Sequence, residues 1–107
     1  MRYTSKEFKE SVTAAVALIP FGKAMGYGDV ACQIGYPGRA RQVGFVLSQL
    51  FETEIPWWRV IRSDGSIALR GDLVRGPQQI RLLKAEGVPF RGQRVDMSKA
   101  RFFGDID

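Results

Sequence analysis

Residues 29–50 read DVACQIGYPGRARQVGFVLSQL, and this stretch decides the kind of fold the chain can form. Its pattern predicts a short helix over residues 29–34, starting near Gly28, and a second helix over residues 39–50 after a break rich in glycine. The second helix directs four apolar residues inward: Val43, Val46, Leu47 and Leu50. Two helices joined by a tight turn form a helix-turn-helix. Many helical pairs of this kind bind nothing, so the motif alone leaves the function open.

The outer face of the second predicted helix carries small residues and arginines. Ala40 and Gly44 add little bulk, so the helix axis could approach another surface closely. Arg41 stands with Arg39 at the start of the helix, where the helix dipole slightly disfavours a cation. A solvated charge is the ordinary explanation for such an arginine. Its placement against the dipole nevertheless favours, modestly, a surface that meets a polyanion.

Length and composition fit one compact, basic domain spanning residues 1–107. Hydrophobic residues make up 45% of the chain, which supports a core, and the net charge is +5. A basic balance allows a polyanionic partner without requiring one. No apolar run approaches the length of a membrane span, and the first residues do not lead into a signal-peptide core. We therefore expect no membrane association and a cytoplasmic location.

The chain contains no histidine and a single cysteine, Cys32. It therefore lacks the usual general base near neutral pH and the commonest metal ligand. One cysteine can form neither an internal disulfide nor a cysteine-rich metal site. We expect Cys32 to be a core residue of the first short helix, and we expect no metal and no cofactor.

A helix is also predicted near the start of the chain. Thr4 and Glu7 have the spacing of a capping box, and the helix ends at the turn of residues 20–23. Its apolar stripe has helical spacing and consists of Phe8, Val12, Ala15, Val16 and Ile19.

The middle of the chain predicts a β-hairpin. Asp64-Gly65 lies between two short apolar runs, residues 59–62 and 67–69, and this dipeptide is a strong hairpin signal. A hairpin that follows a helix-turn-helix is a wing. A flexible basic loop over residues 70–72 follows it.

The last third of the chain predicts one more helix and a docked tail. Pro77 suits the first position of the helix and Gly87 its end. Residues 88–95 read as a short extended segment. The tail, residues 98–107, keeps Phe102 and Phe103, so we expect it to pack on the body.

Residues 54–61, EIPWWRVI, contain the only two tryptophans of the chain, Trp57 and Trp58. Large aromatic residues serve a core about as often as a site, so the Pro-Trp-Trp unit has two interpretations when taken alone.

Five segments in order resemble the O6-alkylguanine-DNA alkyltransferases, and specifically the short alkyltransferase-like proteins with tryptophan at the position of the reactive cysteine. These are residues 19–23 (IPFGK), 27–31 (YGDVA), 37–44 (PGRARQVG), 55–61 (IPWWRVI) and 83–88 (LKAEGV). The resemblance implies an α+β, mostly helical fold: the winged helix-turn-helix of the C-terminal domain of those enzymes. It also implies binding through the DNA minor groove and flipping of a damaged guanine into a pocket.

The resemblance also assigns roles to individual residues. Tyr27 matches the tyrosine that crowds the phosphate beside the flipped nucleotide, Arg41 the arginine that fills the vacated stack, and Trp57 the alkyl-accepting cysteine. Arg70 matches an arginine at the mouth of the base pocket, within the pocket-closing loop of residues 65–71. The implied DNA-binding residues are Tyr27, Arg39, Ala40, Arg41, Gly44 and Ser63. The implied lesion pocket comprises Pro56, Trp57, Trp58, Arg59, Val60, Ile67, Arg70 and Gly71.

The chain differs from the family pattern at the residues that carry out alkyl transfer in the enzymes. The enzymes use a cysteine nucleophile, a histidine that takes its proton through water, and a glutamate that orients the histidine. Here Trp57 and Trp58 stand in the first two places and only Glu86 remains. We therefore expect no catalytic residue, while the role of Trp58, either a second pocket wall or simple packing, stays open.

The resemblance implies a non-catalytic sensor that binds double-stranded DNA containing O6-alkylguanine and hands the lesion to nucleotide excision repair proteins. We expect a monomer in the cytoplasm, associated with the bacterial nucleoid when bound to DNA. A winged-helix transcription regulator without lesion specificity is the main alternative, because it would also use a helix-turn-helix. A catalytic alkyltransferase and a plain structural domain with a basic surface are the remaining ones.

Overall fold

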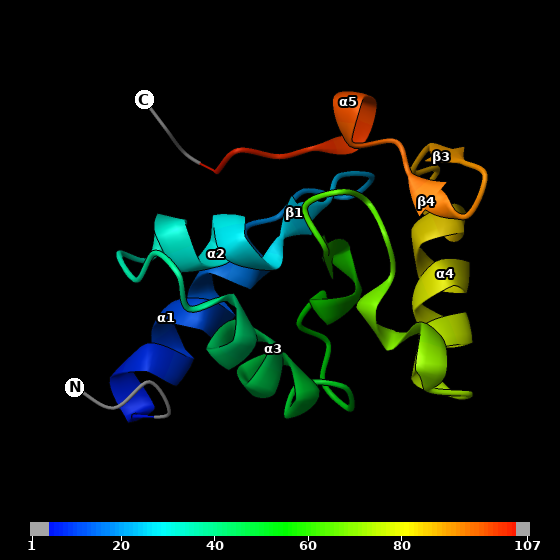
Figure 1. The fold of residues 1–107 in the computed structure, drawn as a ribbon. Helices are drawn as coiled ribbons and strands as arrows, with labels where there is room; N and C mark the ends of the chain where they lie inside the picture. Colours follow the sequence, from blue (N-terminus) through cyan, green and yellow to red (C-terminus); the bar gives the residue numbers. More distant parts are fainter. Residues whose placement is uncertain (1–4, 105–107) are drawn as a thin grey trace.

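The computed structural model describes residues 5–104, without the side chain of Arg70, and has the expected α+β, mostly helical fold (Figure 1). The α-helices are α1 (Lys6–Ala17), α2 (Tyr27–Gln33), α3 (Ala40–Ser48), α4 (Arg75–Ala85) and α5 (Met97–Ala100). Two 3-10 helices are η1 (Trp57–Arg59) and η2 (Ala68–Gly71). The strands are β1 (Met25–Gly26), β2 (Val60–Ile61), β3 (Phe90–Arg91) and β4 (Arg94–Val95). Within the described residues, no helix is long and apolar enough to cross a membrane.

Helix α1 forms where the apolar stripe predicts it and buries Phe8, Val12 and Val16. Ser5 caps it, because its hydroxyl accepts a hydrogen bond from the Phe8 amide at 3.2 Å. The predicted capping residue Thr4 lies outside the described residues. Ile19, 1% exposed, continues the buried stripe beyond the helix end.

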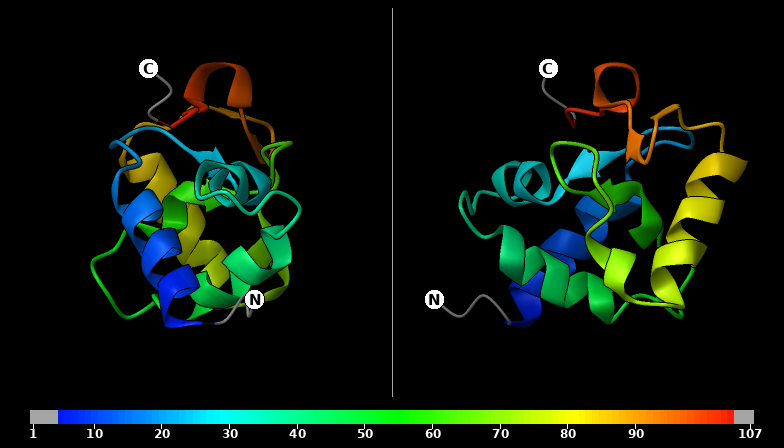
Figure 2. Two further views of the ribbon diagram at one scale, coloured as in Figure 1. Left: turned by 90° about the vertical axis from the view of Figure 1, so that its left-hand side faces the viewer. Right: turned by 45° about the vertical axis from the view of Figure 1, so that its right-hand side comes forward.

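The helix-turn-helix is present as α2 and α3, which lie side by side (Figures 1 and 2). Helix α2 begins at Tyr27, slightly earlier than predicted, because Gly26 provides its cap and the Asp29 carboxylate accepts from the Gly26 amide at 3.2 Å. Cys32 is exposed, so the prediction of a core cysteine is wrong. Val30 and Ala31 occupy the buried face of α2, and the next residue turns outward.

The predicted hairpin is wrong in its second half. The Asp64-Gly65 turn does form: the Arg62 amide donates to the Ser66 carbonyl at 3.1 Å, and the Gly65 amide donates to the Arg62 carbonyl at 2.8 Å. After it, however, Ile67 enters the core at 2% exposure and the chain coils into η2, so no strand pairs back. Strand β2 pairs instead with β1, in parallel, with Met25 opposite Val60. The wing is therefore a loop.

Helix α4 begins earlier than predicted, so Pro77 occupies its third position. The Asp72 carboxylate accepts from the amides of Val74 and Arg75 at 2.9 and 2.8 Å and satisfies donors at the helix start. Pro77 remains compatible, since amides of the first turn have no partner within the helix. Gly87, with φ +78°, ends the helix region as expected.

The C-terminal part docks on the body. The predicted extended segment is an antiparallel hairpin, β3 with β4. Arg101 then bridges to Ala24 through the backbone and binds the Asp29 carboxylate on α2 at 2.7 Å. Phe102 packs on the core as predicted, whereas Phe103 is 58% exposed and only its ring face meets Arg101.

The core has two connected halves. One gathers the inner faces of α1, α2 and α3 around Trp57 and Val60. The other joins Ile61 and Ile67 to α4 and the C-terminal hairpin. Trp58 and Leu69 pack against both halves, so η1 and η2 stand at the junction.

Gly65 is the turn residue that the fold depends on most. It adopts φ +89°, and an added Cβ would lie 2.2 Å from the Val95 carbonyl oxygen. Gly35 has the same φ but nothing within 4 Å of such a Cβ.

We expect Gly35→Ala to lower the unfolding free energy by about 1–2 kcal/mol through backbone strain. Gly65→Ala should cost about 2 kcal/mol more through the clash, as measured by urea unfolding. Equal losses for the two variants would show that the turn does not press on Val95.

Candidate nucleic-acid interface

An open groove of about 640 Å³ lies between the helix-turn-helix and the segments that follow β2. Its walls come from α2, α3, the residues after β2, and η2. The lining residues are Tyr27, Gly28, Ala40, Arg41, Gly44, Arg62, Ser63, Ala68 and Leu69. A cavity of about 540 Å³ between α1, α2 and the C-terminal tail contains none of the predicted site residues.

The groove brings together five of the six residues predicted to bind DNA. The sixth, Arg39, is the half-buried residue that precedes α3. Gly28, Arg62, Ala68 and Leu69 also line the groove and were not among the predicted DNA-binding residues, although Ala68 and Leu69 belong to the predicted pocket-closing loop of residues 65–71. The sequence could have predicted Arg62 at the surface, because an arginine directly after the apolar pair of β2 must leave the core. Gly28 follows Tyr27 in α2, whereas Ala68 and Leu69 reach the groove through η2, where the hairpin prediction was wrong.

Helix α3 presents a smooth face to the groove. Ala40 and Gly44 line it, and a Cβ added to Gly44 would lie 3.7 Å from Cε1 of Tyr27. The Tyr27 ring therefore packs over Gly44, which fixes the first turn of α2 against α3. The predicted close approach of another surface at Ala40 and Gly44 stays a prediction, because the contact at Gly44 is with Tyr27 of the same chain.

The polar groups of the groove are donors of positive or neutral character. Among the described residues that line the groove, Arg41 and Arg62 are charged and none carries a carboxylate. Burial raises the pKa of the Tyr27 phenol, and the nearby charge of Arg62 only partly opposes this, so the hydroxyl keeps its proton at neutral pH. A groove with these donors suits an anionic, oxygen-rich ligand.

The predicted lesion-pocket residues other than Arg70, whose side chain lies outside the described part of the structure, do not line the groove. Trp57 is 2% exposed, and its ring packs edge-on against Phe51 and Trp58, with centroids 4.7 and 5.9 Å away. Pro56, Val60 and Ile67 are also buried. Gly71 is exposed at the end of η2, and Arg70 lies within η2 with its side chain outside the described part of the structure.

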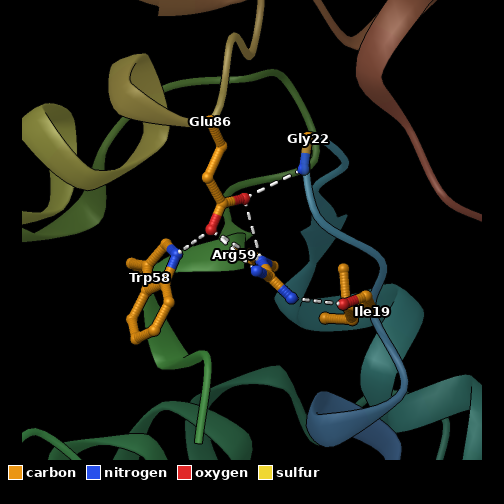
Figure 3. Close-up of polar contacts among 5 residues, drawn as sticks. All are labelled: Ile19, Gly22, Trp58, Arg59 and Glu86. Carbon is orange, nitrogen blue, oxygen red and sulfur yellow. Dashed lines mark hydrogen bonds and ion pairs between the residues drawn. The ribbon is translucent and has the colours of Figure 1, made fainter. Parts of the chain in front are cut away.

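Trp58 and Arg59 instead belong to a buried polar network around Glu86 (Figure 3). The Glu86 carboxylate accepts from Trp58 Nε1 at 2.8 Å, from Arg59 at 2.7–3.1 Å and from the Gly22 amide at 2.9 Å. The other end of the guanidinium donates to the Ile19 carbonyl at 2.7 Å. The indole N–H of Trp58 is thus a structural donor, and this contact was not predicted.

The contacts of this network determine the protonation state of the Glu86 carboxyl. Burial alone would raise the pKa of the Glu86 carboxyl, but the hydrogen bonds from Arg59, Gly22 and Trp58, with the charge of Arg59, together lower it. The side chains of Arg59 and Glu86 are only 14% and 7% exposed, so the pair is well shielded from water. Glu86 is therefore an ionised anchor at neutral pH.

The described residues contain no cluster of three or more His, Cys, Asp or Glu that could hold a metal ion.

Comparisons with known proteins point in one direction. Residues 7–88 match the family model described as "6-O-methylguanine DNA methyltransferase, DNA binding domain". A DNA base-flipping protein of Vibrio parahaemolyticus is 45% identical over 84 residues, which are 77% of this chain and 81% of the relative. Alkyltransferase-like protein 1 of Schizosaccharomyces pombe is also 45% identical over 84 residues, 77% of each chain.

A solved structure extends the likeness to the fold. S. pombe Atl1, in complex with damaged DNA containing O6-carboxymethylguanine, superposes with a TM-score of 0.84 at 35% identity. The match covers 95% of this chain and 98% of that one.

Glu86→Gln should reveal the anchor through its pH dependence. Because the folded pKa is depressed, the stabilisation is complete above the ordinary glutamate pKa of about 4.3 and is lost as pH falls through the lower folded value. We expect the variant to unfold with about 3 kcal/mol less free energy at pH 7, since Arg59 stays buried without its partner. The difference from the unsubstituted protein should shrink as the pH is lowered below 4, in urea titrations.

The matched control is Glu52→Gln. Glu52 pairs with Arg75, but its side chain is 82% exposed, so its loss should cost below about 1 kcal/mol. If the two variants lose the same stability, the Glu86 network is not an anchor.

Proposed function

Because the chain belongs to the family of the 6-O-methylguanine DNA methyltransferase DNA-binding domain, we propose that it binds duplex DNA containing O6-alkylguanine. It holds the modified nucleotide flipped out of the stack and leaves the alkyl group in place. The observation that carries the proposal is the groove, which gathers the smooth face of α3, two arginines and the Tyr27 hydroxyl.

The groove supplies what nucleotide flipping requires. Extruding a base costs a few kcal/mol, and less where the pair is already weakened by damage. Arg41 is exposed in the first turn of α3, where its side chain can extend into the stack and occupy the vacated space. Tyr27, packed over Gly44, stands where it crowds the phosphate of the rotating nucleotide.

The place of the flipped base lies on the η2 side of the groove. Leu69 lines the groove and also packs on the core that contains Trp57. Because Trp57 is covered, a base that reaches it requires η2 and its flanking loop to shift outward, with Arg70 and Gly71 on the moving segment. Trp57 then serves as the apolar wall beside the alkyl group.

The residues at the site argue against alkyl transfer. The indole of Trp57 is no nucleophile toward an alkyl carbon, and the chain has no histidine to activate one. Glu86 is occupied by Trp58, Arg59 and Gly22. Cys32 lies on α2 outside the lining of the groove. In our proposal the protein recognises the lesion in the cytoplasm, shields it and leaves its removal to nucleotide excision repair.

Competition between matched duplexes tests the proposal. A labelled duplex with one O6-methylguanine should be displaced by the same modified duplex at roughly tenfold lower concentration than by the unmodified one. A 2-aminopurine beside the lesion should brighten as the neighbouring base leaves the stack. Equal displacement by both duplexes would instead favour a transcription regulator without lesion specificity.

Arg41→Ala provides the internal control for flipping. It should abolish the 2-aminopurine signal and weaken lesion binding by more than a single phosphate contact, which changes the salt slope by about one. Arg81→Ala removes an equal charge from the exposed side of α4 and should change neither.

Alkyl transfer should be absent. After incubation with O6-methylguanine DNA, the protein mass should not increase by a methyl group, and the lesion should persist in the DNA. Trp57→Cys should behave the same way, because no histidine is present. Circular dichroism and DNA binding check that this core variant still folds. A methylated peptide containing residue 57 would disprove the argument, whereas methylation confined to Cys32 would mark a reaction outside the groove.

A further inference from the structure

Arg62 stands at the rim of the groove for a structural reason. The two residues of β2, Val60 and Ile61, are fully buried and pair with β1, so the chain must turn outward at the next position. Arg62 is exposed there and lines the groove. It forms no ion pair within 4 Å among residues 5–104: the Asp64 carboxylate accepts from Ser66 and pairs with Arg94, and the charge of Arg62 adds only the smallest of the effects that lower the pKa of Asp64.

Two further hydrogen-bond donors line the same groove. Tyr27 lines the groove beside Arg62, and its protonated hydroxyl can donate to an anion. Ser63 follows Arg62, and a Cβ added to Gly26 would meet the Ser63 hydroxyl oxygen at 2.4 Å. The Ser63 hydroxyl is therefore pressed against the residue that precedes Tyr27. The lining of one groove therefore contains a guanidinium, a phenol and an aliphatic hydroxyl, in addition to Arg41.

We propose that Arg62, with Tyr27 and Ser63, forms a clamp for one phosphate of the DNA backbone. The inference rests on the proposed function, because it places DNA in the groove. A guanidinium flanked by neutral donors suits the tetrahedral oxygens of a phosphate. The contact is independent of sequence and of the lesion, so it raises affinity for every duplex and fixes the register in which the flipped nucleotide meets the groove.

The other anion that could reach Arg62 is a charged adduct, such as the carboxylate of O6-carboxymethylguanine. A phosphate is present in every duplex, whereas the carboxylate is present only in that lesion. Comparing duplexes that differ only in the adduct therefore separates the two sources.

The experiment measures Arg62→Ala binding to three duplexes, unmodified, O6-methylguanine and O6-carboxymethylguanine, over a range of salt concentrations. We expect affinity to fall about tenfold on all three, as for one charge-assisted contact. The plot of log affinity against log salt should lose about 0.9 of slope for one phosphate. Arg62→Lys should keep the salt slope and regain part of the affinity. Arg81→Ala is the control for net charge.

Two outcomes would overturn the inference. Loss confined to the O6-carboxymethylguanine duplex would show that Arg62 reads the adduct. Unchanged affinity and salt slope on all three duplexes would show that it contacts no anion. Neither outcome affects the proposed function, which depends on the preference of the unsubstituted protein for modified over unmodified DNA.

Discussion

The ionised carboxylate of Glu86 is the constraint on which the rest of the structure depends. A buried charge is tolerated only where opposite charge and hydrogen-bond donors surround it, and here Arg59, Trp58 and the Gly22 amide provide them. The donors come from η1 and from the turn after α1, while Glu86 itself follows α4 (Figure 3). Three segments that share no continuous secondary structure are thereby held in one arrangement.

The Glu86 network also fixes the geometry of the groove. Helix η1 runs directly into β2, and β1 runs directly into α2. Because β1 and β2 pair in parallel, fixing Arg59 also fixes Arg62 and Ser63, which follow β2, and Tyr27, which follows β1. Strands of two residues have little stability of their own. Their register is held by the buried side chains beneath them and by Gln79, whose amide donates to the Trp58 and Val60 carbonyls at 3.1 and 2.9 Å.

Local sequence patterns could predict the helices and the smooth face of α3, because helical period and glycine placement are short-range properties. They could not predict the partner of β2. Asp64-Gly65 specifies a turn, but Met25, far away in the chain, competes for the strand edge and Ile67 gains more by entering the core. The same limit explains the site. Tyr27, Arg41 and Ser63 could be placed by family pattern, and the apolar pair before Arg62 indicates that this arginine turns outward. Ala68 and Leu69 lie in the predicted pocket-closing loop, but they line the groove through η2, which local patterns did not predict.

Trp58 shows how a residue can keep the structural contact of the family relay without its proton transfer. In the relay that the family resemblance implies, the residue at position 58 must donate to Glu86 and also accept a proton. An indole N–H donates but has no acceptor, so Trp58 keeps the buried carboxylate satisfied while the relay ends. Replacement by a residue without a donor would remove one of the carboxylate's hydrogen bonds and weaken the anchor. Tryptophan at this position is therefore compatible with an intact groove and with the non-catalytic role that we propose, because the contact with Glu86 needs a donor and no acceptor.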